Sequence, residues 1–360
     1  MLATDEKNIQ LIEYLESMGF SSFPVDGYKV INWYSSLDEE LDSIYNGVAL
    51  RNISHQGMIE LKGKDALDLV HRIGTNSVKD LPKEGVKKTI FTSEKGRIIG
   101  LTTLMNFENY QILVCDRASK LKVIGWIRKY AISDDVEVND ANTKYNLLEL
   151  SGPQAESFAT LICGNMVNDI QPNSFKIIHT ENILFFMIKI PGERGKNKFW
   201  FLADFENSKR LIVYMKEHKN VFNFSMVGEE AYNIFRVEQG LPLAPNELND
   251  EYNPLETGLD DIIDFKKGCY IGQEVIARLD TYDKINKHLV MIESEKDFTA
   301  DDSKIINDGK ECGYITSSAY KTGLGFVKTI YLDFKKDYNI KQKGIQINCK
   351  LKPINQSLLK

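Results

Sequence analysis

A cysteine at position 269 stands in the stretch DFKKGCYIGQEVIARL, where residue types and spacing could support thiol chemistry. Lys266 and Lys267 precede it, and the flanking glycines suit a tight turn. QEVIARL then resumes at helical spacing, so we expect the thiol a few residues before a helix N-terminus. The unpaired N–H groups there and the two lysine charges both favour thiolate over thiol. Cys269 is therefore a candidate nucleophile, and the alternative is a small buried residue in a glycine turn.

The other cysteines and the histidines give this thiol no obvious partner in the sequence. The chain has five of each, without a CxxC pair or a Cys/His cluster, at positions 115, 163, 269, 312 and 349 and at 55, 71, 179, 218 and 288. No base can be paired with Cys269, and zinc held by ligands close in sequence is nearly excluded. An odd cysteine count argues against a complete disulfide framework, so a reducing cytoplasm is expected.

Hydrophobic periodicity predicts an α+β protein built from several packed parts. Residues 1–45 form an N-terminal segment with a helix near its start. A first module at 46–145 and a second at 146–284 share one order of strand, helix, β-meander and helix, and the second contains the cysteine motif. Residues 285–360 show the short strands and turns of a small β-barrel or sandwich. DDIIDF, just before the glycine turn, is predicted to be a strand.

The composition limits the partners of the chain. Of its 360 residues 42% are hydrophobic and 27% are charged, with a net charge of −6, so the whole molecule is not built to hold a nucleic-acid backbone. The acidic N-terminus lacks the apolar run of a secretory signal. No segment approaches the ~18 apolar residues of a membrane span. We therefore expect neither direct nucleic-acid binding nor membrane insertion.

The motif KGCYIGQEVIAR resembles the signature of the YgfZ-type folate-binding proteins, relatives of the glycine-cleavage T-protein, an aminomethyltransferase. Other stretches are similar to T-protein blocks, among them GVALRNISHQG, LLELSGPQAESF and FRVEQGLPLAPNEL. The resemblance covers about residues 45–330. It implies two α/β modules and a C-terminal barrel, arranged as three domains in a ring around a channel that holds tetrahydrofolate.

The resemblance also assigns roles to individual residues. Glu193, in PGERG, stands where T-proteins have a glutamate that pairs with the pterin, and a carboxylate can accept two parallel hydrogen bonds from such a ring edge. The alternative for Glu193 is a solvated turn residue. Arg236 stands where an arginine lies near the folate, or it forms an ion pair with Glu238 or Glu256. The remaining cofactor-binding candidates are Asp116, Lys267 and Tyr270.

One departure from the T-protein pattern bears on activity. Aminomethyltransferases carry an acidic pair in the meander, whereas this chain has Gly100 and Leu101 there, and neither side chain can relay a proton. We therefore expect a tetrahydrofolate-binding, YgfZ-like protein that supports iron–sulfur enzyme maturation or repair and tRNA modification through Cys269. Its partners would be folate and iron–sulfur client enzymes. The alternatives are a folate-dependent aminomethyltransferase or related one-carbon transferase, and an interaction protein that has lost folate.

Overall fold

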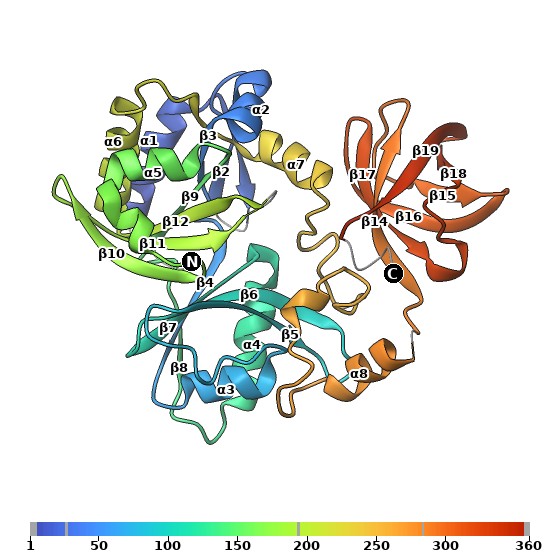
Figure 1. Cartoon of the computed structure of the whole chain (residues 1–360), viewed down its shortest axis with the longest axis horizontal. Helices are drawn as coiled ribbons and strands as arrows, with labels where there is room; N and C mark the ends of the chain where they lie inside the picture. The colour runs from blue at the N-terminus through green and yellow to red at the C-terminus, as the bar shows by residue number, and fades with distance from the viewer. Residues whose placement is uncertain (1–5, 26–27, 193–194, 283, 356–360) are drawn as a thin grey trace.

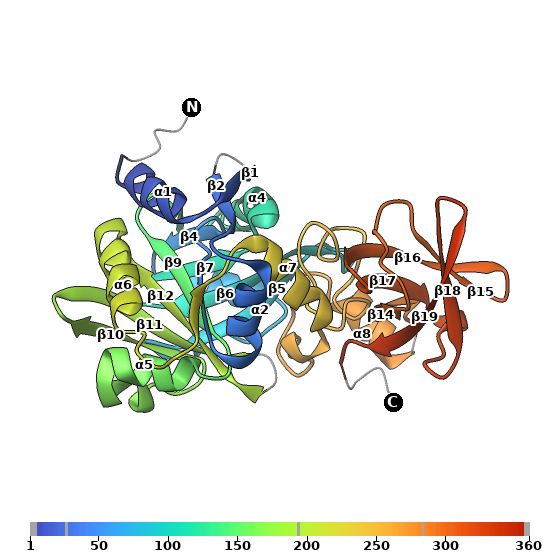
Figure 2. The same ribbon diagram turned by 90° about the horizontal axis from the view of Figure 1, so that it is seen from above.

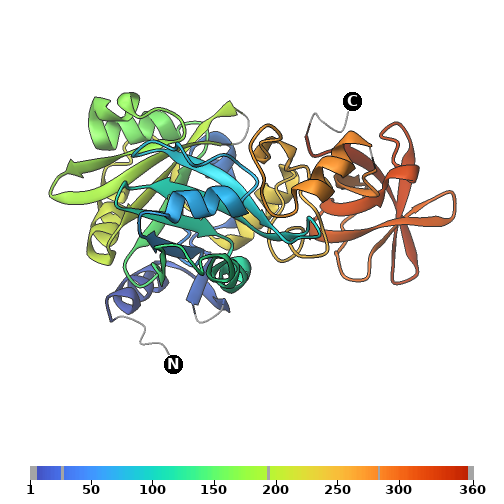
Figure 3. The same ribbon diagram turned by 90° about the horizontal axis from the view of Figure 1, so that it is seen from below.

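The computed structural model describes residues 6–25, 28–192, 195–282 and 284–355. Two units with one sheet each lie beside a barrel, and loops and short helices connect the three around the centre of the molecule (Figure 1). Seen from above and from below, the barrel occupies one end of the molecule and the two sheets the other (Figures 2 and 3). The predicted α+β architecture with a C-terminal barrel is confirmed. None of the described helices is long and apolar enough to cross a bilayer.

The first unit is a five-stranded sheet in the order β5-β6-β7-β4-β8. Its strands are β4 (Gly57–Lys62), β5 (Val86–Thr92), β6 (Ile98–Asn106), β7 (Tyr110–Cys115) and β8 (Glu137–Asp140). Two helices pack on it, α3 (Ala66–Ile73) and α4 (Lys120–Tyr130). The inner face of α3 is apolar, with Leu69, Val70 and Ile73 buried. The β-meander predicted for the first module is confirmed as β5, β6 and β7.

The second unit is a six-stranded sheet in the order β10-β11-β12-β9-β3-β13. Its strands are β3 (Val48–Asn52), β9 (Asn146–Ser151), β10 (Ser174–Thr180), β11 (Ile183–Pro191), β12 (Asn197–Ala203) and β13 (Phe224–Met226). Its helices are α1 (Glu6–Met18), α2 (Leu37–Asn46), α5 (Ala155–Cys163) and α6 (Phe205–Glu217). The predicted repeat is confirmed, because β4-α3-β5-β6-β7-α4 and β9-α5-β10-β11-β12-α6 share one chain order. They also share one strand order in their sheets.

Strand β3 does not follow the predicted division of the chain. It pairs with β9 antiparallel and with β13 parallel, so a strand assigned to 46–145 completes the sheet of 146–284. Val48, Ala49 and Leu50 are all fully buried, as expected of a central strand covered on both faces. The hairpin of β1 (Ser21–Val25) and β2 (Tyr28–Trp33) precedes it. The predicted boundaries therefore separate stretches of sequence but not the two sheets.

The C-terminal part is a closed barrel in the order β14-β17-β16-β15-β18-β19. Its strands are β14 (Lys287–Ser294), β15 (Lys304–Asn307), β16 (Lys310–Ala319), β17 (Thr322–Lys328), β18 (Asp337–Gln342) and β19 (Ile345–Pro353). A separate core fills it, with Val290, Ile292, Tyr338 and Ile340 fully buried. Closure leaves the barrel without an unpaired edge strand.

The segment between the second sheet and the barrel contains α7 (Glu229–Glu238) and α8 (Gln273–Thr281). The strand predicted for DDIIDF is wrong, because this stretch begins with the short 3₁₀ helix η4 (Asp260–Ile262). Its N–H groups bond within the turn, from Ile262 to Leu259 and from Ile263 to Asp260. The two isoleucines of the stretch are buried by contacts that do not require a neighbouring strand. The helix predicted from QEVIARL is confirmed as α8.

Candidate functional site

A cavity of about 1170 Å³ opens where β3, the start of α7 and the turn after β7 meet. Hairpin β1–β2 contributes Val25 and Val30 to its wall. Its charged groups include Arg51 from β3, Asp116 after β7 and Glu229 from α7. Strand β3 and helix α7 hold Arg51 and Glu229, so these two positions are more rigid than loop residues would allow.

Arg51 is the centre of a buried ion network beside the cavity. Its guanidinium donates to Glu149 at 3.1 Å and to Glu229 at 2.7 Å, and only 4% of its side chain is exposed. Arg51 and Glu149 are cross-strand neighbours on β3 and β9, so the register itself brings them together. The guanidinium carbon lies 3.2 Å from the centre of the Tyr232 ring, which is cation–π geometry.

The network keeps its carboxylates charged. Burial raises the pKa of Glu149, but the charges of Lys198 and Arg51 outweigh burial and lower it to about 2. Burial likewise opposes ionisation of Glu229, and Arg51 holds the pKa of that carboxyl below its ordinary value. Burial lowers the pKa of His55, which also lines the cavity, so its imidazole is neutral at pH 7. These groups provide fixed charge and hydrogen-bond acceptors rather than proton transfer.

Asp116 is the cavity group that titrates near neutral pH. Burial raises its pKa to about 6, and the charge of Glu247 adds to this effect. A hydrogen bond from the Ala244 N–H to Oδ2, at 3.1 Å, and the charge of Arg236 act in the opposite direction. A carboxyl group with such a pKa can both donate and accept a proton at physiological pH. Among the described residues of the cavity wall, Asp116 is therefore a group suited to acid–base chemistry.

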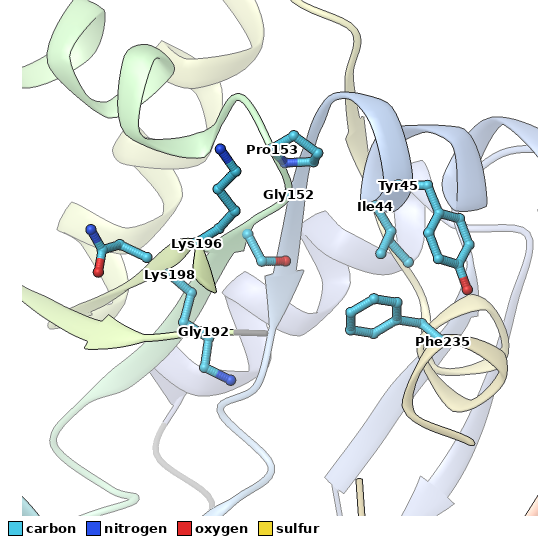
Figure 4. Close-up of a pocket in the computed structure, with 10 residues that line it drawn as sticks. Ile44, Tyr45, Gly152, Pro153, Gly192, Lys196, Lys198 and Phe235 are labelled. Carbon is cyan, nitrogen blue, oxygen red and sulfur yellow. The ribbon is translucent and has the colours of Figure 1, made fainter. Parts of the chain in front are cut away.

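A smaller pocket of about 390 Å³ lies at the other end of the ion network. Ile44, Tyr45 and Phe235 form one side of it, and Lys196 and Lys198 lie on the opposite side (Figure 4). The Lys198 ammonium contacts Glu149 at 3.2 Å, so the chain of charges runs from this pocket to Arg51. The predicted pterin ligand Glu193 lies outside the described residues.

Arg236 has a different environment from the one expected. Its guanidinium is 3% exposed and pairs with Glu247 at 3.3 Å, and it is not among the described residues that line the cavity. Glu238 instead accepts a hydrogen bond from Tyr45, and Glu256 pairs with Arg97. The partner of Arg236 is therefore Glu247 and neither of the two carboxylates expected from the sequence.

Lys267 anchors the cysteine motif on the first unit, and Tyr270 packs within the connecting segment. The buried Lys267 ammonium donates to the carbonyls at the end of α3 and just after it, those of His71, Gly74 and Asn76, at 2.5, 2.6 and 3.1 Å. Burial lowers its pKa to about 8. Tyr270 packs against Leu255, Ile263 and Ile276. Both side chains are used in anchoring, and neither is among the described residues of the cavity wall.

Cys269 is exposed, whereas the other four cysteines are buried. Burial raises the pKa of Cys115, Cys163 and Cys349 to about 12, and that of Cys312 is raised as well. Of the five thiols, Cys269 is thus the one that a reagent or partner can reach. The anchored residues on both sides of it fix where the thiol is presented.

The two positions that lack the acidic pair are packing positions on β6. A Cβ atom at Gly100 would lie 2.6 Å from a Val123 methyl group of α4, so no side chain fits there without movement. Leu101 packs against the cluster that α7 shares with the barrel, including Ile234 and Val237. At both positions the side chain or its absence serves van der Waals packing between elements, and neither position carries an acid.

Sequence reasoning missed the ion network. The signal was present, because Arg51 in VALRN and Glu149 in NLLELS are single charges inside otherwise apolar strands. A buried charge needs a partner. Two lone opposite charges in two central strands therefore predict an ion pair, provided that the strands are neighbours.

Residues 11–267 match the family described as the GCVT N-terminal domain. Among curated proteins, the chain is 28% identical over 338 residues to a putative chloroplastic transferase of Arabidopsis thaliana, covering 88% of this chain and 73% of that protein. It is 24% identical over 358 residues to an aminomethyltransferase of Desulfitobacterium hafniense strain Y51, covering 97% of this chain and 98% of that protein.

Among solved structures, the fold is similar to that of the glycine cleavage system aminomethyltransferase T from Bartonella henselae. The TM-score is 0.82 with 17% identity, and the match covers 96% of each chain. At this identity the likeness concerns the fold. The wider family expected from the sequence is confirmed by the family match over residues 11–267. Because the family match spans more than half of the 360 residues, the chain belongs to the GCVT family, that of the glycine-cleavage T-proteins.

Proposed function

We propose that the cavity binds a tetrahydrofolate derivative. The wall combines apolar side chains with a few placed charges, as in ligand pockets generally. The Arg51–Tyr232 stack offers a flat, polarised surface for a heteroaromatic ring. Membership of the T-protein family supports the same ligand, and several relatives are named aminomethyltransferases.

We propose further that this folate-binding protein supports iron–sulfur enzymes, in maturation or repair, including those that modify tRNA. The observation that carries this proposal is the exposed thiol of Cys269 in a protein whose β6 has packing residues at the acid positions. The YgfZ-like motif around Cys269 points to the same branch of the family. Client enzymes would meet the thiol on the outer surface of the motif. Five unpaired cysteines suit a reducing compartment, and we propose the cytoplasm.

The ligand is tested by titrating tetrahydrofolate into the full chain. Trp200 donates its indole N–H to Glu149 at 2.9 Å, so a ligand that contacts Arg51 should change its fluorescence. We expect saturable quenching that Trp200→Phe removes, while calorimetry still detects binding by that variant. Trp126→Phe, on α4, is the matched control and should keep the signal. An absence of saturable heat with the unmodified protein would contradict the proposal and favour an interaction protein that has lost folate.

The thiol role is tested in cells that lack the protein. Activity of a dependent iron–sulfur enzyme should fall, and the unmodified chain should restore it. We expect Cys269→Ser to fail at normal abundance. Gly268→Ala, which changes the neighbouring residue in open space, should succeed. Full restoration by Cys269→Ser would remove the thiol from the proposal while leaving folate binding intact.

A one-carbon transferase is the second candidate, and Asp116 is the observation that favours it. Its pKa of about 6 gives the cavity a proton donor and acceptor from a different strand end than β6. The assay is tetrahydrofolate-dependent release of ammonia from an aminomethylated lipoyl carrier protein. If the protein shows turnover, and Asp116→Asn abolishes it while Cys269→Ser leaves it unchanged, the transferase becomes the favoured function. Absence of turnover by a protein that binds folate would favour the accessory role.

A further inference from the structure

Glu247 is a buried carboxylate to which three parts of the molecule bind. It is fully buried and follows α7 by nine residues. Its Oε2 atom accepts from Arg236 of α7 at 3.3 Å and from the Leu243 N–H at 3.1 Å. Its Oε1 atom accepts from the hydroxyls of Thr316 and Ser317, both on barrel strand β16, at 2.5 and 2.7 Å. Helix, loop and barrel are thus joined at one side chain.

The barrel reaches Glu247 through an irregularity in β16. Neighbouring residues of a regular strand point to opposite faces, so consecutive side chains do not meet one partner. Here the pairing with β17 shifts between Ile315 and Ser317, which leaves Thr316 as an extra residue. Such a bulge re-aims side chains and bends the strand. It allows two successive hydroxyls to donate to the same carboxylate oxygen, an arrangement that a regular strand would not give.

The loop held by Glu247 is the loop that holds Asp116. The Leu243 N–H donates to Glu247, and the next residue, Ala244, donates its N–H to Asp116 at 3.1 Å. Leu243, Ala244 and Asp116 all line the cavity. Two consecutive N–H groups are therefore directed to two carboxylates, one fixed by the barrel and one facing the ligand space.

We infer that Glu247 is a positioning residue for Asp116, and that Thr316 and Ser317 of the barrel set the environment of that acid through it. This deepens the proposed function, because Asp116 lies in the cavity proposed to bind folate. A displacement of the barrel or of β16 would move the 243–245 segment and weaken the hydrogen bond to Asp116. The N–H bond stabilises the charged carboxylate, so its loss makes the acid weaker.

The test replaces both barrel donors in Thr316→Val/Ser317→Ala and follows the titration of Asp116. Carboxyl-labelled aspartate is observed by NMR in the protein without ligand, and Asp116→Asn assigns the signal. We expect the midpoint to rise from about 6 by about half a pH unit or more. The Ala244 amide should exchange faster with solvent. Arg236 also donates to the Ser317 hydroxyl at 2.9 Å, so Thr316→Val alone, which keeps that bond, is measured beside the double variant and should give a smaller rise. The charged or titratable groups around Asp116 are Cys115, Arg117, Arg236, Glu247, His55, Glu229 and Glu230.

The matched control is Ser318→Ala, the next residue on β16, whose hydroxyl is not among the donors to Glu247. It should leave the midpoint and the Ala244 exchange as in the unmodified chain. Should the double variant fail to fold, Ser317→Ala alone keeps the Thr316 bond and should give a smaller rise. An unchanged midpoint in the folded double variant would overturn the inference, and so would an equal rise in Ser318→Ala. Failure to bind folate would be read in a separate titration and would leave this result unaffected.

Discussion

At the scale of single residues, Asp116 lines the cavity, and its ionised form lowers the stability of the folded state. Its pKa is near 3.8 in an open chain and about 6 in the fold, because burial disfavours its charge. Between these values the folded state binds more protons than the unfolded state. The free energy of unfolding therefore falls as pH rises through that window and stays lower above it. Residues kept at such a cost are commonly those that function requires.

Asp116→Asn should accordingly stabilise the protein at pH 7. The amide oxygen can still accept the Ala244 N–H, while the buried charge is gone. The gain in free energy of unfolding should be roughly 3 kcal/mol at most, since one pKa unit corresponds to about 1.4 kcal/mol. It should shrink as pH falls from 6 towards 4. Urea unfolding at several pH values measures it, and a gain that is the same at pH 4 and pH 7 would contradict the assignment.

Alkylation separates the five thiols. Cys269 should react with iodoacetamide at pH 7 long before the others, because it is exposed and the others are buried. A thiol whose pKa is about 12, such as Cys163 or Cys349, has only about one thiolate in 10⁵ molecules at that pH. Mass spectrometry of a time course locates the label. Labelling of Cys163 at a similar rate in the native protein would refute the expectation.

The sequence could identify Cys269 as the thiol to consider, because glycines, lysines and a helix start lie beside it. It could not reveal that Lys267 points to three backbone carbonyls or that Arg236 meets Glu247. Motif positions give the residue type and the neighbours along the chain. The direction of a side chain depends on partners from remote segments, and these become known only when the fold is known.

At the scale of elements, the glycine turn before α8 is constrained at one of its two glycines. Gly272 has φ 84°, and a Cβ atom there would lie 2.5 Å from the Ser93 carbonyl oxygen. Gly268 has no neighbouring atom within 4 Å of such a Cβ. The turn therefore needs glycine where it crosses the end of β5, and not beside the cysteine.

Gly272→Ala should lower the free energy of unfolding by about 2 kcal/mol or more, from backbone strain and overpacking combined. Gly268→Ala, in the same turn, should change it by less than about 0.5 kcal/mol. Urea denaturation of both variants gives the comparison. Equal effects at the two positions would contradict the described geometry of the turn.

Most elements were predictable because their periodicity is clear, as in α3, in α8 and in the β5–β7 meander. DDIIDF was not, since six residues of mixed polarity fit a strand or a buried turn equally well. Whether the stretch forms a strand depends on a neighbouring strand that can accept its hydrogen bonds. The local sequence does not contain that information.

At the scale of the whole molecule, the two sheets share one core. Val86, Met105 and Ile112 of the first sheet pack in the same cluster as Ile188 and Leu202 of the second. Backbone hydrogen bonds also cross between the sheets, from Val86 to Asn173 and from Phe175 to Glu84, both at 2.9 Å. The repeat was visible in the sequence, but the contact between the two sheets was not. The hydrophobic pattern of each module can be explained by packing within that module alone.

The shared core predicts that the two sheets unfold together. In a Trp33→Phe background, a further Trp126→Phe leaves Trp200 to report on the second sheet, and Trp200→Phe leaves Trp126 to report on the first. Each variant is unfolded in urea and followed by both fluorescence and circular dichroism. In each variant the fluorescence midpoint should equal the circular-dichroism midpoint. Fluorescence midpoints displaced from the circular-dichroism midpoint in opposite directions would indicate two independent units.

Strand β3 has a consequence for synthesis of the chain. It ends at Asn52, whereas its two neighbours begin at Asn146 and Phe224. At ribosomal speeds of about 5–20 residues per second, the second neighbour emerges on the order of ten seconds or more after β3. During that interval an apolar strand with exposed hydrogen-bonding edges is available to chaperones or to other nascent chains. Strand β3, although synthesised early, is thus among the last strands to be fully paired.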